Sequence, residues 1–205
     1  MPDLYIILYI LLTAVVAYLI GSIPTGYIIV KAKTNQDIRT IGSGSTGATN
    51  VKRVLGKKWF FIVLLLDAFK GAFPVILAEI LAKFVGDSIG ILAVVASIFV
   101  ILGHSKPIFL QFKGGKSVAS GVGTILALNI FVGLSIAVIW ATITYFSKYV
   151  SLGSIIALSL SPILMYYFKN PICYTIYCAI AAIYIIYLHR ENIKRLIKGE
   201  ENKVR

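Results

Sequence analysis

Charged residues are scarce in this chain of 205 residues, and acidic ones are the scarcest. Asp, Glu, Lys and Arg together make up 14% of the sequence, with 8 acidic residues against 20 Lys and Arg. A soluble domain of this size carries nearly twice that charged share. Instead, 59% of the residues are hydrophobic, the mean hydropathy is +0.90, and long apolar runs recur along the whole length. This composition argues against a soluble domain and predicts an integral membrane protein with several spans.

Cysteine is nearly absent, and a basic N-terminal segment is missing. Cys173 and Cys178 fall in the last apolar run, where their spacing places them on different sides of a helix. Neither an intrahelical disulfide nor a metal site is expected from them. The start, MPDLYIIL, has no Lys or Arg before its apolar run, unlike a secretory signal. We therefore expect the first segment to be a retained span, and we expect no metal and no cofactor.

The apolar runs predict an all-α polytopic membrane protein, organised as a single domain over residues 1–205. Pro24 is expected to kink or unwind the end of the first span. The fourth run has two readings, either one long tilted helix or two short helices hinged near Asn129. The expected runs cover residues 4–30, 59–82, 88–102, 118–146, 150–168 and 172–188.

Positive charge is concentrated in three segments. Residues 31–58, 103–117 and 189–205 hold seven, three and six of the 20 Lys and Arg. The positive-inside rule places all three segments in the cytoplasm, which requires residues 118–146 to cross twice. The prediction is seven transmembrane helices, some of them short, with the N-terminus outside and the C-terminus cytoplasmic. Six crossings with a re-entrant segment is the alternative. The net charge of +12 is thus explained by membrane topology, and no nucleic-acid partner is expected.

The richest of these segments is IGSGSTGATNVKRVLGKK, residues 41–58. Gly42, Gly44 and Gly47 favour positive φ, and successive N–H groups in such a turn form an anion-binding concavity. Arg53 adds a planar fork suited to phosphate. A flexible, positively charged loop is the alternative for this stretch alone. With both histidines in the other two segments, the three together indicate a phosphorylated, lipid-linked substrate.

Five motifs occur in one order along the chain and carry a resemblance: GSIPTG (21–26), GSGSTGATNVKRVLGKK (42–58), DAFKG (67–71), GHSKPIFLQFKGGKSVAS (103–120) and HRENIKRL (189–196). They resemble the bacterial acyl-phosphate-dependent glycerol-3-phosphate acyltransferases, the PlsY family. This resemblance implies a multi-pass protein of the cell inner membrane with a cytoplasm-facing active site. It also implies a reaction of phospholipid synthesis, in which an acyl group passes from acyl phosphate to the sn-1 hydroxyl of glycerol-3-phosphate. The products are 1-acyl-glycerol-3-phosphate and phosphate, and membrane lipids surround the enzyme.

The resemblance implies site residues in all three cationic segments. Ser45 stands where the family usually has Asn, and Ser117 where it usually has Gly; a Cβ at Ser117 is expected to restrict the turn slightly. The expected catalytic residues are Ser43, Arg53, His189 and Asn192. The expected substrate-binding residues are Gly42, Gly44, Asn50, His104, Lys113, Gly114, Gly115, Lys116 and Glu191. For His104 a helix-end role is an equal alternative.

The chemistry requires two anions to be held together, so Arg53, Lys116 and glycine N–H groups are the expected ligands. His189 could act as general base, since the ordinary pKa of histidine lies near neutral pH. A substrate phosphate oxygen could take the proton instead, and the lack of an obvious carboxylate partner for His189 favours this second reading. Asp67 and Lys70 are read as an intramembrane ion pair rather than as catalytic groups.

A transporter of a phosphorylated metabolite is the competing class of protein. Transporters usually place their site near the bilayer midplane and are often built from repeated halves. Here the polar groups collect at one face and no repeat is found, so the sequence favours the enzyme.

Overall fold

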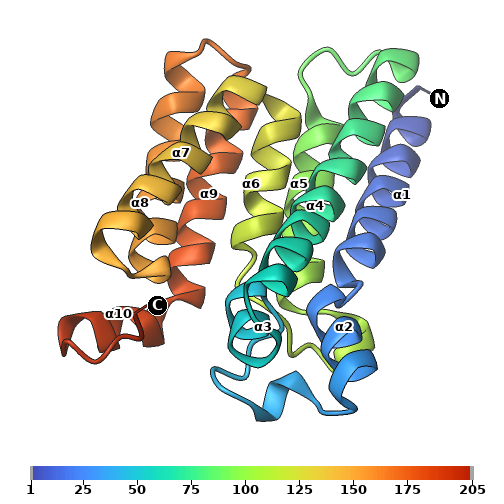
Figure 1. Cartoon of the computed structure of the whole chain (residues 1–205). Coiled ribbons are helices and arrows are strands. Elements are labelled where there is room, and N and C mark those ends of the chain that lie inside the picture. The colour runs from blue at the N-terminus through green and yellow to red at the C-terminus, as the bar shows by residue number, and fades with distance from the viewer. Residues whose placement is uncertain (1, 204–205) are drawn as a thin grey trace. The chain divides into compact units, whose positions relative to one another are not determined.

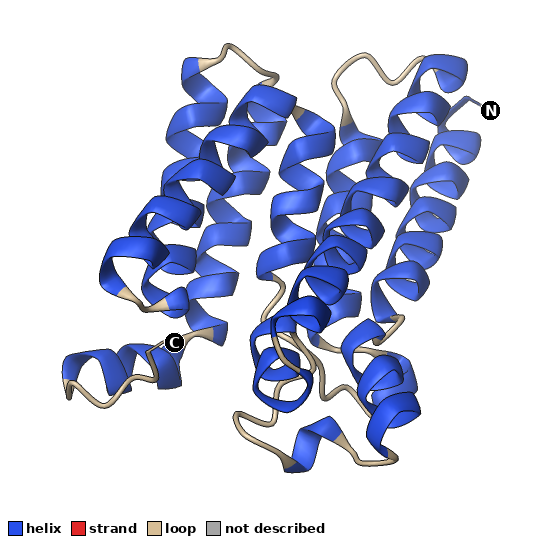
Figure 2. Cartoon of the chain, viewed as in Figure 1, coloured by secondary structure: helices blue, strands red, loops and turns tan. Residues whose placement is uncertain are grey.

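All regular structure in residues 2–203, the part of the chain that this computed structural model describes, is helical (Figure 2). Five helical segments in that part are long and apolar enough to cross a membrane. The helix α9 (Ile172–Leu188) with its bent continuation α10 (Arg190–Ile197) brings the number to six. The helix α6, at 11 residues, is apolar but shorter. The expected all-α membrane architecture is therefore confirmed, while the count of seven crossings and the orientation of the termini stay predictions.

The chain divides into two compact units between Thr124 and Ile125, so the single domain over residues 1–205 stays a prediction. The helix α6 (Val118–Leu128) runs across this division. The elements of the first unit before α6 are α1 (Pro2–Ser22), α2 (Thr25–Thr34), η1 (Ile38–Thr40), α3 (Ala48–Leu55), α4 (Lys57–Val85), α5 (Ile91–Ser105) and η2 (Ile108–Leu110).

The break between α1 and α2 lies where Pro24 was expected to interrupt the first span. The helix α1 ends at Ser22 and α2 begins at Thr25, so the predicted interruption is confirmed. Proline lacks an N–H and its ring clashes with the preceding turn, which explains the break. In the first unit, α2 and α3 lie at the opposite end of α1 from the N-terminus (Figure 1).

A small apolar cluster fixes the polar end of the first unit. Val30, Ile38, Val51 and Val63 are fully buried against one another, and they come from α2, η1, α3 and α4. Burying such side chains stabilises the fold by about 1.5–3 kcal/mol each. The loop between η1 and α3 is thus held at both of its ends by packed apolar side chains.

Close helix contacts hold the rest of this unit. At Gly71 of α4 a Cβ would collide with the backbone of Ser120, so α4 and α6 approach at backbone distance. Small residues permit such contacts between membrane helices. The hydroxyl of Tyr18 in α1 donates to the carbonyl of Lys106, 2.8 Å away, and ties α1 to the segment that follows α5.

The second unit holds α7 (Ile130–Ser147), α8 (Val150–Tyr167), α9 (Ile172–Leu188) and α10 (Arg190–Ile197). Residues 118–146 form two helices that meet at Asn129, as the two-helix reading predicted. The Asn129 carbonyl oxygen caps α7 by accepting from the N–H groups of Phe131 and Val132, both at 3.0 Å. The helix α10 bends by 62° from α9 (Figure 1).

Large apolar side chains remain exposed on the helices of both units. Phe84, Phe146 and Ile183 are exposed over 83%, 78% and 70% of their surface. A water-soluble protein rarely exposes so many large apolar groups, whereas a bilayer solvates them. These surfaces face lipid in an integral membrane protein.

Candidate active site

Asn50 organises the loop of residues 41–47. Its side chain is 1% exposed, and its amide nitrogen faces the carbonyls of Ile38, Ile41 and Ser45 at 3.2, 2.9 and 3.0 Å. Its carbonyl oxygen accepts from the N–H of Ser43 at 3.1 Å. The polar atoms of this side chain are therefore used by the loop itself, although the sequence suggested a substrate ligand.

The glycines of this loop act through shape rather than through their N–H groups. Gly42 and Gly44 take φ of 59° and 67°, as expected, but Gly47 has φ of −76° and stands in extended backbone before α3. The Gly44 N–H donates to the carbonyl of Ile41, and the Gly47 N–H donates to the Ser45 hydroxyl. Together with the Ser43 N–H, these donors point into the loop, so the expected concavity of free N–H groups is not formed by them.

Two of the side chains predicted as ligands in this region lie on its outer surface. Ser43 is exposed, and so is Arg53, which projects from the last turn of α3. The Cδ of Arg53 lies 3.5 Å from where a Cβ of Gly42 would stand, so its stem runs beside the glycine turn. Within the described residues Arg53 forms no ion pair.

The second loop is also closed by its own glycines. The N–H of Gly114 donates to the carbonyl of Ser105 at 3.2 Å, and the N–H of Gly115 donates to the backbone carbonyl of His104 at 3.1 Å. These N–H groups are therefore not the phosphate donors that the sequence suggested. Lys113 is exposed and Lys116 is half-buried, so charge at this loop is carried by lysine side chains.

Ser117, which replaces the usual glycine, adopts the left-handed conformation itself. Its φ is 58°, and its buried hydroxyl donates to the carbonyl of Ile101 at 2.7 Å. A non-glycine residue there costs about 1–2 kcal/mol, and a hydrogen bond of this kind returns about 1 kcal/mol. The expected restriction of the turn is therefore largely offset by the hydroxyl.

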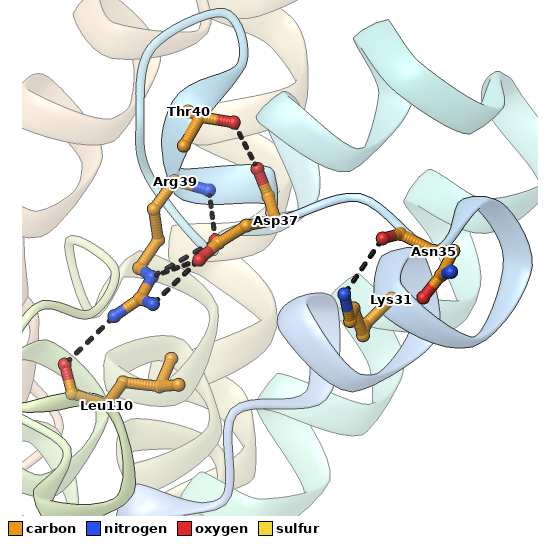
Figure 3. A network of polar contacts seen from close by, with 6 residues as sticks. All are labelled: Lys31, Asn35, Asp37, Arg39, Thr40 and Leu110. Atoms are coloured by element: carbon orange, nitrogen blue, oxygen red, sulfur yellow. Dashed lines mark hydrogen bonds and ion pairs between the residues drawn. The ribbon is translucent and has the colours of Figure 1, made fainter.

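Arg39 connects the first loop to the second within the first unit. Its guanidinium forms an ion pair with Asp37, with Nη2 at 2.7 Å from Oδ2, and donates to the carbonyl of Leu110 at 3.3 Å (Figure 3). It also lies over the ring of Tyr27 at 5.5 Å. The Arg39 guanidinium lowers the pKa of Asp37 below its ordinary value. The loop that precedes α3 and the loop that carries Lys116 are thus linked by a charged hydrogen-bonded bridge.

Asp67 and Lys70 form the predicted intramembrane ion pair. Lys70 Nζ lies 3.0 Å from Asp67 Oδ1, and both side chains are almost fully buried. His104 from α5 lies close by, with Nδ1 at 3.7 Å from the same Asp67 oxygen and 5% of its side chain exposed. His104 therefore does not lie on the outer surface of the second loop, where a substrate ligand was expected.

In the second unit, His189 stands between α9 and α10 and is 4% exposed. Its Nδ1 lies 2.8 Å from the carbonyl of Ile185. Because a carbonyl only accepts, this contact places the proton of a neutral ring on Nδ1 and leaves the lone pair on Nε2. The backbone thus supplies the orienting partner that the sequence did not reveal.

Glu201 supports Asn192, and sequence reasoning missed it. The Asn192 amide donates to Glu201 Oε1 at 2.6 Å, Arg195 donates to Oε2 at 2.7 Å, and Ser151 donates to Oε1 at 3.0 Å. Glu191, which was expected among the substrate-binding residues, instead has 58% of its side chain exposed. It pairs with surface cations of its own helix.

The Glu201 cluster makes stability depend on pH. Burial alone would raise the pKa of Glu201, but hydrogen bonds from Asn192, Arg195 and Ser151 outweigh it, so the pKa lies below the ordinary value of 4.5. A depressed folded-state pKa stabilises the protein above that value, and the stabilisation is lost as the pH falls through the folded-state pKa. We expect the melting temperature of the wild type to fall as the pH drops below 4.5. The Glu201→Gln variant should have a lower melting temperature than the wild type at neutral pH, and its melting temperature should fall less on acidification. Equal falls in both proteins would contradict this prediction.

No group of His, Cys, Asp and Glu side chains in residues 2–203 is arranged to hold a metal ion. Cys173 and Cys178 are not joined in a disulfide. The predicted site residues of each unit carry hydroxyl, amide, imidazole or cationic groups, which are chemically suited to phosphate and to acyl transfer.

Comparison with known proteins gives one consistent result. The family model described as glycerol-3-phosphate acyltransferase matches residues 11–199. A glycerol-3-phosphate acyltransferase of Gloeobacter violaceus is 43% identical over 92% of this chain and 91% of its own length. One of Clostridioides difficile is 42% identical over 95% of each chain. The crystal structure of PlsY, an integral membrane glycerol 3-phosphate acyltransferase, is 38% identical in its glycerol 3-phosphate form, with a TM-score of 0.88 over 96% of both chains. Its lysophosphatidic acid form has a TM-score of 0.86 at 37% identity, covering 96% of this chain and 95% of that one.

Proposed function

Because the chain belongs to the glycerol-3-phosphate acyltransferase family, we propose that it acylates the sn-1 hydroxyl of glycerol-3-phosphate with acyl phosphate as donor. The observation that carries this proposal is the pair of loops linked by Arg39. Arg53 lies beside the first loop and lysines lie on the second, while the N–H groups of Gly44, Gly47, Gly114 and Gly115 are used internally. Both substrates are anions, and cations held on preformed loops overcome the repulsion between them. The products are 1-acyl-glycerol-3-phosphate and phosphate.

Phosphate recognition falls to side chains in this proposal. Arg53 offers its fork to a phosphate, Ser43 donates its hydroxyl, and Lys113 and Lys116 supply charge from the second loop. Their support is the exposure of Ser43 and Arg53 and the absence of any ion pair of Arg53 within the described residues. The glycines of both loops shape the backbone, and Asn50 holds the first loop closed.

His189 acts as the general base. The hydroxyl oxygen of glycerol-3-phosphate attacks the carbonyl carbon of the acyl phosphate, the bond to the phosphate oxygen breaks, and phosphate leaves as an anion. His189 Nε2 takes the hydroxyl proton and passes it to the departing phosphate. Its support is the contact of Nδ1 with the Ile185 carbonyl, which leaves Nε2 as the acceptor. Asn192, held by Glu201, binds the glycerol part of the substrate.

We further propose that seven helices cross the membrane, namely α1, α4, α5, α6, α7, α8 and α9. The N-terminus then lies outside, and the active site and C-terminus face the cytoplasm. The support is the placement of Lys and Arg, together with the break at Asn129 that makes α6 and α7 separate helices. Labelling of cysteines introduced at the two ends of α6 from each side of the membrane tests this topology. Labelling of both ends from the same side would overturn it.

The reaction itself is tested with purified protein in detergent, labelled glycerol-3-phosphate and, in separate reactions, palmitoyl phosphate or palmitoyl-CoA. We expect labelled lysophosphatidate with the acyl phosphate and none with the thioester. Arg53→Ala is the matched control, because Arg53 is exposed and its loss should abolish product while the melting temperature is kept. Product from the thioester alone would overturn the donor assignment. No product with any donor would overturn the enzyme and favour a transporter.

A further inference from the structure

Three titratable side chains of α4 and α5 meet beneath the second loop of the first unit. Asp67, Lys70 and His104 have 2%, 8% and 5% of their side chains exposed. Buried charges are costly in a membrane protein unless they are paired, and such residues are usually retained for a purpose. The acyl transfer proposed above does not use any of the three as a substrate ligand.

The ion pair stabilises the break between α1 and α2. Lys70 Nζ donates to the carbonyl of Ile23 at 2.6 Å, and the hydroxyl of Thr25 donates to Asp67 Oδ1. A helix interrupted by Pro24 leaves backbone groups that need partners, and in a bilayer such partners must come from the protein. Asp67 is thereby held in place by groups from both α2 and α4.

The ring of His104 fills the space between Asp67 and the turn of residues 114–116. Its Nδ1 faces Asp67 at 3.7 Å and, among the described residues, has no hydrogen-bond partner. On its other side, Nε2 is the atom nearest to the place that a Cβ of Gly115 would take, and the two would overlap. The backbone of Gly115 therefore rests directly on the imidazole, and its N–H donates to the carbonyl of His104.

We propose that His104 is a positioning residue. Its ring, held in place by Asp67 and Lys70, supports the backbone of residues 114–116 and so fixes the position of Lys116 relative to a substrate phosphate. This inference rests on the proposed acyltransferase function. A displacement of about 1 Å in such a group is enough to cost up to 10²-fold in rate. Glycine is required at position 115 for space rather than for conformation, since Gly115 is not among the residues with positive φ.

The test is a double-mutant cycle between His104→Ala and Gly115→Ala, read as kcat/KM per folded enzyme. Each single variant is expected to lower kcat/KM about tenfold. His104→Ala removes the support under the turn, and Gly115→Ala pushes the turn away from the ring. With the imidazole gone the new methyl group has room, so the double variant should stay within about threefold of His104→Ala. Independent sites would multiply to a loss of about 100-fold, and that result would overturn the proposal.

Gly114→Ala is the matched control, because a Cβ there would meet the carbonyls of His104 and Ser105 and the ring of Pro107, none of which His104→Ala removes. No rescue is expected for that pair, and equal rescue of both glycine variants would contradict a specific contact. If His104→Ala does not fold, His104→Asn replaces it in the cycle. If the wild type makes no product, that result counts against the proposed function alone. The contact between His104 and Gly115 is then tested by the same cycle with melting temperature as the readout.

Discussion

Replacing His189 by glutamine is expected to lower kcat for acyl transfer by about 10²-fold or more, with little change in KM for glycerol-3-phosphate. A general base contributes typically about 10²–10⁴ to the rate. Glutamine keeps a hydrogen-bonding group near the position of the ring but cannot take a proton. The effect should fall on kcat because the substrate still binds while the hydroxyl is no longer deprotonated.

The measurement is steady-state turnover with acyl phosphate in detergent, alongside the melting temperature of each variant. His189→Ala should lose as much kcat as the glutamine variant and should also raise KM, because it removes the polar contact. Turnover by His189→Gln within about threefold of the wild type would eliminate the base. The proton would then pass to a substrate phosphate oxygen, with His189 only orienting the glycerol. The sequence alone favours that second route, because the contact of His189 with the Ile185 carbonyl is visible only in the fold.

Helices and their interruptions were largely predictable from the sequence. Long apolar runs must be helical in a bilayer, because only a helix satisfies its own backbone there. Pro24 lacks a donor, and Asn129 offers a side-chain cap, so both interruptions follow from local chemistry. The ion pair of Asp67 and Lys70 followed in the same way, from two opposite charges three residues apart in an apolar helix.

The internal hydrogen bonds of the site were not predictable in this way. A glycine-rich loop has the same composition whether its N–H groups point outward to an anion or inward to its own carbonyls. In this protein the buried amide of Asn50 and the carbonyls of His104 and Ser105 turn them inward. Glu201 was missed for a related reason. In a tail of charged residues it is indistinguishable from a solvated side chain until the fold brings Ser151, 50 residues away, to its carboxylate.

Replacing Asn50 by aspartate is expected to destabilise the protein by at least about 3 kcal/mol and to abolish activity. The shape of the side chain is kept, but an oxygen then faces the carbonyls of Ile38, Ile41 and Ser45 in place of the amide donor. Each buried carbonyl left without a donor costs about 1–3 kcal/mol, and a buried carboxylate without a cation adds to that cost. For a chain of this size the loss corresponds to a fall of about 10 °C in melting temperature.

The matched control is Asn35→Asp, the same chemical change at an exposed residue that ends α2. It should leave melting temperature and kcat/KM nearly unchanged. Asn50→Ala should be intermediate in stability, because it removes the donor without adding a charge. The two measurements separate the roles that Asn50 can have. An Asn50→Asp protein that melts like the wild type but is inactive would make Asn50 a substrate ligand. One that melts early and regains no activity at saturating substrate would establish it as the group that keeps the loop closed, because added substrate cannot replace bonds made within the chain.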